Sequence, residues 1–106
     1  MAPESPEIPH PARGEIALEA VLQALSDPIR LEIVRMAAQA DNQPCNAFTE
    51  RIPKSTMSHH WKVLREAGVI RQTQHGVQRL NSLRRDDLDA RFPGLLDAIL
   101  NAPPAR

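Results

Sequence analysis

Apolar positions recur every three or four residues along much of the chain, which predicts a protein built mainly from amphipathic helices. The first such segment spans 15–25. A second helix is predicted from Pro28, because Asp27 can cap its free N–H groups and proline suits the first helical position. The last apolar stretch, 86–100, contains Pro93, which we expect to split or kink it. Helices therefore begin and end the predicted domain.

The middle of the chain combines a short helix, a turn and a longer helix. The short helix is predicted at 46–51, and Pro53 then interrupts the chain. The longer helix starts at Lys54 or Ser55, with Ser55 the better cap, and ends just before Gly68. This order is that of a helix-turn-helix.

Two runs of extended character follow, at 69–74 and 77–83, with His75 and Gly76 between them. Gly76 supplies the positive φ that a tight hairpin turn needs. A basic hairpin directly after a helix-turn-helix forms a wing. The pattern therefore predicts a winged helix-turn-helix, a mainly α fold with a β-hairpin wing.

This winged domain is predicted to span residues 14–101. Residues 1–13 contain four prolines and are expected to form a disordered tail, as are residues 102–106. No run approaches the roughly 18 apolar residues of a membrane span. The single cysteine, Cys45, is compatible with a reducing compartment.

The net charge of zero hides a strong asymmetry along the chain. Residues 51–85 hold eight Lys or Arg against one Glu, whereas residues 1–50 hold three against eight Asp or Glu. A concentrated positive stretch is the electrostatic footprint of a polyanion site. A solvated charged face is the alternative interpretation.

The two adjacent histidines of the longer helix face different surroundings. At about 100° per residue, Met57, Trp61 and Leu64 share one apolar stripe. His59 lies on the opposite, polar side, whereas His60 lies beside the stripe and is expected to pack at the edge of the core. Neighbouring helical residues do not share a face, so the pair is a poor metal chelate.

Two stretches, ALSDPIRLEIVRMA at 24–37 and KSTMSHHWKVLREAGVI at 54–70, resemble the ArsR/SmtB family of bacterial winged-helix repressors. The resemblance covers roughly residues 15–100. It implies a homodimer of the bacterial cytoplasm whose first and last helices form the subunit interface. It also implies binding to an inverted repeat of double-stranded operator DNA and release when an effector binds.

The metal-ligand motifs of that family are not present. Metal-sensing members often carry a Cys-x-Cys pair near the first helix of the helix-turn-helix, where this chain has Cys45 alone. Others use histidines on the last helix, but no histidine follows His75. We therefore predict no metal and no cofactor. Cys45 is a candidate redox sensor, because a helix N-terminus stabilises a thiolate, with an inert core residue as the alternative.

The phasing and the resemblance together predict the contact residues. The long helix would meet DNA through Lys54, Ser55, Thr56, Ser58, His59 and Lys62, and the wing through Gln74, His75, Gly76, Gln78 and Arg79. The predicted dimer interface consists of Leu18, Val21, Leu22, Leu95, Leu96, Ile99 and Leu100.

The leading interpretation is a homodimeric, sequence-specific DNA-binding repressor that releases its operator in response to a non-metal signal. A winged-helix module that binds proteins rather than DNA, and a metal-responsive repressor with an atypical site, are the alternatives. An enzyme is not expected, because the chain has no glycine-rich phosphate loop and nothing places a histidine beside Cys45.

Overall fold

The computed structural model describes residues 8–41, 43–44 and 51–105. Its elements are η1 (Arg13–Glu15), α1 (Leu18–Ala24), α2 (Pro28–Ala37), β1 (Gln43–Pro44), α3 (Lys54–Glu66), β2 (Ile70–His75), β3 (Gln78–Leu83), α4 (Arg85–Arg91) and α5 (Leu95–Asn101). None of the helices in the described part of the chain is long and apolar enough to cross a bilayer. The short helix predicted at 46–51 falls almost entirely outside the described residues.

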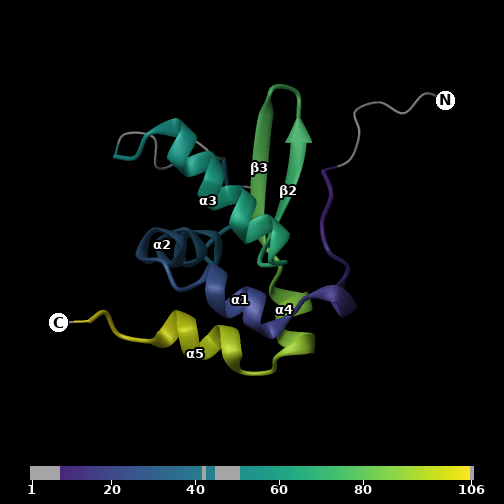
Figure 1. The fold of residues 1–106 in the computed structure, drawn as a ribbon, viewed down its shortest axis with the longest axis vertical. Helices are drawn as coiled ribbons and strands as arrows, with labels where there is room; N and C mark the ends of the chain where they lie inside the picture. Colours follow the sequence, from purple (N-terminus) through teal and green to yellow (C-terminus); the bar gives the residue numbers. More distant parts are fainter. Residues whose placement is uncertain (1–7, 42, 45–50, 106) are drawn as a thin grey trace.

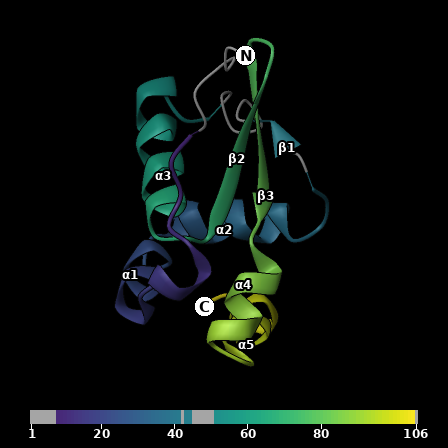
Figure 2. The ribbon, with the colours of Figure 1, turned by 90° about the vertical axis from the view of Figure 1, so that its right-hand side faces the viewer.

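The hairpin of β2 and β3 projects from a base formed by the helices, with α3 lying beside it (Figures 1 and 2). The sheet has the order β1-β3-β2 and is antiparallel throughout. The helix–helix–hairpin–helix order is the predicted one. The pairing of β1 with β3 was not predicted, because a strand of two residues carries no alternation that a sequence can reveal.

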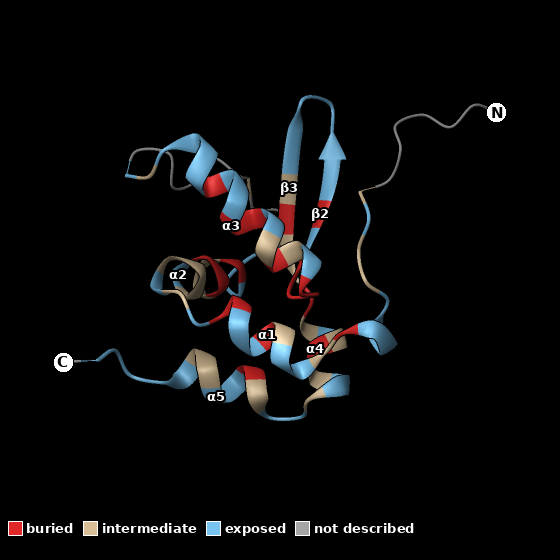
Figure 3. Ribbon diagram, in the orientation of Figure 1, coloured by how far each residue is buried: buried red, intermediate tan, exposed pale blue. Residues whose placement is uncertain are grey.

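The core lies where α1, α2 and α3 meet the base of the hairpin, and the outer half of the hairpin is exposed (Figure 3). Its fully buried side chains include Ile33 and Val34 of α2, Leu64 of α3, and Val69 with Ile70 at the start of β2. The wing is thus anchored at its base and free at its tip.

The capping of α2 is confirmed, whereas that of α3 is not. The carboxylate of Asp27 accepts hydrogen bonds from the backbone N–H groups of Ile29 and Arg30, at 2.8 and 3.1 Å. The predicted Ser55 cap is wrong: Pro53 is the N-cap of α3, in an extended conformation, and no side chain caps the helix. Ser55 already lies in the first helical turn.

The terminal helices are shorter than the apolar patterns predicted. Helix α1 begins at Leu18 rather than at residue 15, because Glu15 ends η1 and its carboxylate accepts a bond from the Ala12 N–H at 2.8 Å. The predicted split at Pro93 is confirmed: α4 ends at Arg91 and α5 begins at Leu95.

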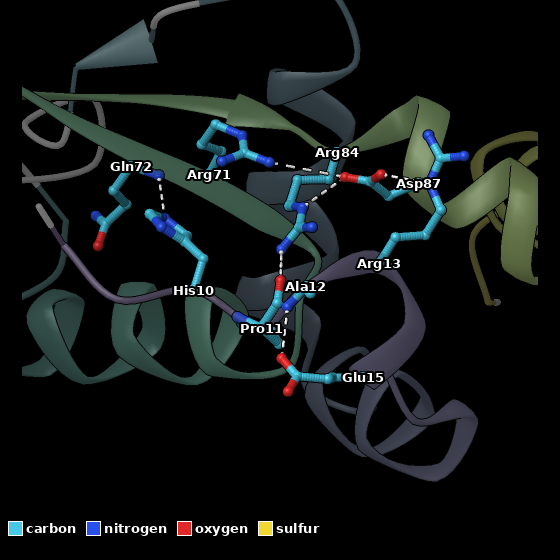
Figure 4. A network of polar contacts seen from close by, with 9 residues as sticks. All are labelled: His10, Pro11, Ala12, Arg13, Glu15, Arg71, Gln72, Arg84 and Asp87. Carbon is cyan, nitrogen blue, oxygen red and sulfur yellow. Dashed lines mark hydrogen bonds and ion pairs between the residues drawn. The ribbon is translucent and has the colours of Figure 1, made fainter.

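The predicted disordered tail is wrong for residues 8–13, which we call the N-terminal arm. The arm runs along the outer edge of β2 (Figures 1 and 4). The backbone N–H of Gln72 donates to Nε2 of His10 at 2.9 Å, and Nη1 of Arg84 donates to the carbonyl of Pro11 at 2.7 Å. An edge strand and a buried arginine have donors to satisfy, and these donors hold the proline-rich arm in place. The residues before the arm lie outside the described part of the chain.

A tight turn after α3 leads directly into the wing and depends on Gly68. Its φ is +87°, and a Cβ added there would lie 2.6 Å from Cγ1 of the buried Ile16. We expect Gly68→Ala to lower the free energy of unfolding by at least about 2 kcal/mol, through left-handed strain and overpacking together. Urea denaturation followed by circular dichroism measures this loss.

Gly76→Ala is the matched control, because Gly76 also has a positive φ, of 63°, but has open space around its Cα. It should lose only the strain component, about 1 kcal/mol. Equal losses in the two variants would contradict the role assigned to the contact with Ile16.

Candidate nucleic-acid interface

Helix α3 buries one stripe and exposes the opposite face, as predicted. Met57, Trp61 and Leu64 are buried in the core. All six helix residues predicted to contact DNA are exposed: Lys54, Ser55, Thr56, Ser58, His59 and Lys62. The exposed face therefore carries small hydroxyl groups, one imidazole and two ammonium groups.

The end of α3 fixes the distance between the helix and the wing. The N–H of Gly68 donates to the carbonyl of Arg65 at 3.1 Å, and the N–H of Val69 donates to that of Leu64 at 3.0 Å. These bonds satisfy the last carbonyls of the helix. Strand β2 then starts at Ile70, so the helix and the wing are joined by a turn too short to let them drift apart.

The tip of the wing is polar and internally bonded. Gln74 and Arg79 face each other across the hairpin, and Nε of Arg79 donates to Oε1 of Gln74 at 3.2 Å. The amide of Gln74 donates to the carbonyl of Gly76 at 3.0 Å. Together with His75 and Gln78, these residues are all exposed, as predicted for the wing.

Val77 is a tip residue that sequence reasoning missed. The sequence pattern predicts it inside the second strand, but it occupies the turn between β2 and β3, and its side chain is fully exposed. Its position next to Gly76 in a two-residue loop was the available signal. The wing therefore presents one apolar group at its tip.

The two histidines differ in the way that the helical phasing predicts. His59 is exposed, whereas His60 is buried, with Nδ1 3.1 Å from Nη1 of Arg30. Burial lowers the pKa of His60 below its ordinary value, and the Arg30 charge lowers it further, while Asp27 raises it. A neutral His60 therefore accepts from the guanidinium. Among the described residues, no three His, Cys, Asp or Glu side chains gather as a metal site would require.

Ion pairs neutralise about half of the positive charges of 51–85. Arginines of this stretch bind carboxylates from other segments: Arg51 with Glu32, Arg71 and Arg84 with Asp87, and Arg85 with Asp89 and Asp97.

Four cations of the same stretch keep their charge unneutralised. Among the described residues, Lys54, Lys62, Arg65 and Arg79 have no carboxylate within ion-pair distance. Arg65 and Arg79 each bind a neutral amide oxygen instead, that of Gln72 at 2.8 Å and that of Gln74 at 3.2 Å. The free positive charge thus lies on the exposed face of α3 and on the wing. The sequence could not show this partition.

The residues predicted for a dimer interface fall into two groups. Leu18 and Leu22 of α1 are 42% and 48% exposed, which leaves them available to a partner. Val21 and Leu96 are only 1% and 2% exposed, so their assignment to an interface is wrong: they belong to the core of the protomer. The apolar stripe of a helix is wide enough to face both the core of the protomer and a partner subunit. Periodicity alone does not show which of its residues face which.

The remaining predicted interface residues of α5, Leu95, Ile99 and Leu100, are partly buried against the core. Helices α1 and α5 both lie at the end of the molecule opposite the tip of the wing (Figures 1 and 2). Any partner at this end would leave the wing free. Cys45, the candidate redox sensor, lies outside the described residues.

The fold and the exposed helix–wing surface define a DNA-binding winged helix-turn-helix regulator. Residues 25–73 match the family described as a helix-turn-helix domain. The chain is 34% identical over 82 residues to the HTH-type transcriptional regulator YceK of Bacillus subtilis, covering 74% of this chain and 82% of YceK. The chain belongs to the ArsR-like family of winged helix-turn-helix transcriptional regulators, and it is not an enzyme.

Two further relatives support this assignment. The HTH-type transcriptional regulator MJ1325 of Methanocaldococcus jannaschii is 31% identical over 59 residues, which are 54% of this chain and 66% of that protein. The solved structure of an ArsR-like transcriptional regulator from Rhodococcus sp. RHA1 superposes with a TM-score of 0.58 at 25% identity. The superposition covers 69% of this chain and 70% of that one.

We expect His60→Ala to lower the free energy of unfolding by about 1–2 kcal/mol, because it removes buried contacts and leaves Nη1 of Arg30 without the His60 acceptor. His59→Ala, the matched control on the exposed face, should change it by less than about 0.5 kcal/mol. Urea denaturation at pH 7.5 compares the two variants. Equal losses would show that the assignment of the two faces is wrong.

The same comparison has a pH dependence. Because the pKa of His60 is lowered in the folded state, its contribution is complete above the unfolded pKa of about 6.5 and declines as the pH falls below it. The stability gap between the wild type and His60→Ala should therefore narrow between pH 7.5 and pH 5. A gap that stays constant over this range would contradict a neutral, buried His60.

Proposed function

We propose that the protein is a homodimeric repressor of the bacterial cytoplasm that reads an inverted repeat of operator DNA with α3 and the wing. One observation carries the proposal: among the described residues of 51–85, the four cations with no carboxylate within ion-pair distance, Lys54, Lys62, Arg65 and Arg79, lie on α3 and the wing. Unneutralised cations on a helix and an adjacent hairpin suit a surface that follows the phosphates of a duplex.

The exposed face of α3 has the chemistry to read bases in a major groove. Ser55, Thr56 and Ser58 are short, so the helix can approach base edges closely, and their hydroxyls donate or accept. His59 is exposed and free to point into the groove. Lys54 and Lys62 flank these groups and would meet phosphates, which sets the register of the helix on the duplex.

The wing supplies a second contact to the same duplex. His75, Gln78 and Arg79 are exposed near its tip, and Gly76 lets the backbone approach a phosphate without a side chain in the way. A dimer would bring two such helix–wing units to half-sites about one helical turn, or a multiple of it, apart.

The signal that releases DNA is proposed to be something other than a metal ion. The chain has one cysteine and no histidine after His75, so the familiar thiolate and imidazole ligand sets are lacking in the sequence. Cys45 is the candidate for sensing oxidants. It precedes α3 by nine positions, which is close enough along the chain for a modified thiol to disturb the helix-turn-helix.

The DNA-reading surface is tested on an operator recovered by genome-wide binding of the purified protein. His59→Ala should weaken binding to that operator by about 1–3 kcal/mol if the imidazole reads a base. Lys62→Ala should weaken binding to all sequences alike, and should reduce the slope of log K against log salt by about one. Fluorescence anisotropy titrations between 50 and 300 mM salt give both quantities.

Arg85→Ala is the matched control, because it also removes one positive charge but from a side chain held by Asp89 and Asp97. Its salt slope should equal that of the wild type. A slope that falls equally for Lys62→Ala and Arg85→Ala would show that overall charge, rather than this surface, governs binding. No binding to duplex DNA by the wild type would favour a protein-interaction module.

The proposed dimer is tested on α1. Leu18→Glu combined with Leu22→Glu should give a folded monomer, because both side chains are about half exposed in the protomer and a charge at each would disfavour an apolar interface. Light scattering at micromolar concentration measures the mass. Gln23→Glu, exposed on another side of the same helix, should stay dimeric. A monomeric wild type would refute the dimer.

A further inference from the structure

Gln72 lies where three parts of the molecule meet. It belongs to β2, its exposure is only 2%, and it pairs in register with Asn81 of β3, which is fully buried. Its side-chain oxygen accepts from Nη1 of Arg65 in α3 at 2.8 Å, and its side-chain nitrogen donates to Oδ1 of Asn81 at 2.7 Å. One buried amide of β2 therefore bonds to α3 on one side and to β3 on the other.

The backbone of the same residue binds the N-terminal arm. The N–H of Gln72 points to the outer edge of the sheet and donates to Nε2 of His10 at 2.9 Å (Figure 4). Two further contacts hold the arm in this position. Nη1 of Arg84 donates to the Pro11 carbonyl at 2.7 Å, and Nε of Arg13 pairs with Asp87 at 2.7 Å (Figure 4).

Directional bonds at this junction have an effect that apolar contacts lack. Helix α3 packs on β2, and Leu64 and Ile70 are both buried in the shared apolar core. Apolar contacts tolerate small shifts of a helix across a strand. A buried amide bonded at both ends does not, because a shift leaves donors and acceptors unpaired in a region of low dielectric. The bonds of Gln72 therefore select one angle between the helix and the wing.

We propose that Gln72 is a positioning residue for DNA recognition, because its bonds fix the orientation of α3 relative to the wing. His10 adds the N-terminal arm to this hydrogen-bond network. The inference rests on the proposed function, since a helix and a wing must fit one duplex together. Neither Gln72 nor His10 contacts DNA itself. Both act by holding α3 and the wing, which carry the DNA-contacting residues, in one relative orientation.

The bond from the Gln72 N–H requires an unprotonated Nε2 on His10. Burial lowers the pKa of His10, and Arg71 of β2, Arg84 beyond β3 and Arg65 of α3 lower it further, while a bond to the Ile8 carbonyl raises it. The nearby carboxylates are already engaged: Asp87 binds Arg13 and Arg84, and Glu15 binds the Ala12 N–H. Neutral at pH 7.5, His10 would lose this bond on protonation as the pH falls.

The test compares binding to the operator with binding to a scrambled duplex, at a temperature at which each variant is fully folded. Gln72→Met keeps the shape of the side chain and removes its bonds, so the ratio of specific to non-specific affinity should fall about tenfold. Affinity for the scrambled duplex should change less than about twofold, because the cations that meet phosphates are untouched. Gln72→Glu keeps the acceptor for Arg65 but loses the donor to Oδ1 of Asn81, so it should restore only part of the ratio.

Val34→Ala is the matched control for stability. Val34 is fully buried in α2, apart from this network, so its truncation destabilises the core without changing the ratio. Equal ratios for Gln72→Met and the wild type would overturn the proposal. A wild type that binds both duplexes equally would instead refute the proposed function, and would do so before any variant is compared.

The arm is tested without DNA, through hydrogen exchange at the Gln72 amide. His10→Ala should speed its exchange at least about tenfold at pH 7.5, because the acceptor of that N–H, Nε2 of His10, is removed. His10→Gln retains an acceptor that does not titrate. Protection in the wild type should therefore fall between pH 7.5 and pH 5.5 relative to His10→Gln, after correction for intrinsic exchange. Unchanged protection in His10→Ala would overturn the role of the arm.

Discussion

Burial of one stripe of α3 is the interaction on which the rest of the structure depends. Met57, Trp61 and Leu64 are at most 4% exposed, and each large apolar side chain that is fully buried contributes about 1.5–3 kcal/mol. A rotation of the helix would expose all three together. Because a helix is rigid, this stripe also decides which side chains face away from the core. The polar face that meets solvent is the geometric complement of the apolar face that meets α1 and α2.

Features that depend on local chemistry could be predicted from the sequence. Asp27 and Pro28 mark the start of α2, Gly68 marks the end of α3, and Gly76 marks the turn of the wing, because each meets a backbone requirement within a few residues. The different surroundings of His59 and His60 followed from helical periodicity alone. These signals were enough for the fold and for the exposed face of the candidate site.

Features that depend on partners far along the chain could not be predicted. The arm was expected to be disordered because of its prolines, yet His10 binds an amide 62 positions away. The basic stretch was expected to act as a whole, yet several of its arginines are neutralised by acids from both flanking segments. Val21 and Leu96 carried the same periodic signal as their exposed neighbours. Composition and hydrophobic periodicity predict the element in which a residue lies. They do not predict which distant residues contact it in the folded protein.

The sheet order has a consequence for how copies of this protein coexist. A projecting hairpin offers unpaired N–H and C=O groups that can recruit a strand from another chain. Here β1 pairs with the middle of β3, and the N-terminal arm bonds to the middle of β2, at Gln72, so both sides of the hairpin are covered at mid-length. The uncovered outer part is short and rich in polar side chains such as Gln74, Gln78 and Arg79. The wing can therefore reach far from the core without seeding intermolecular β-sheets.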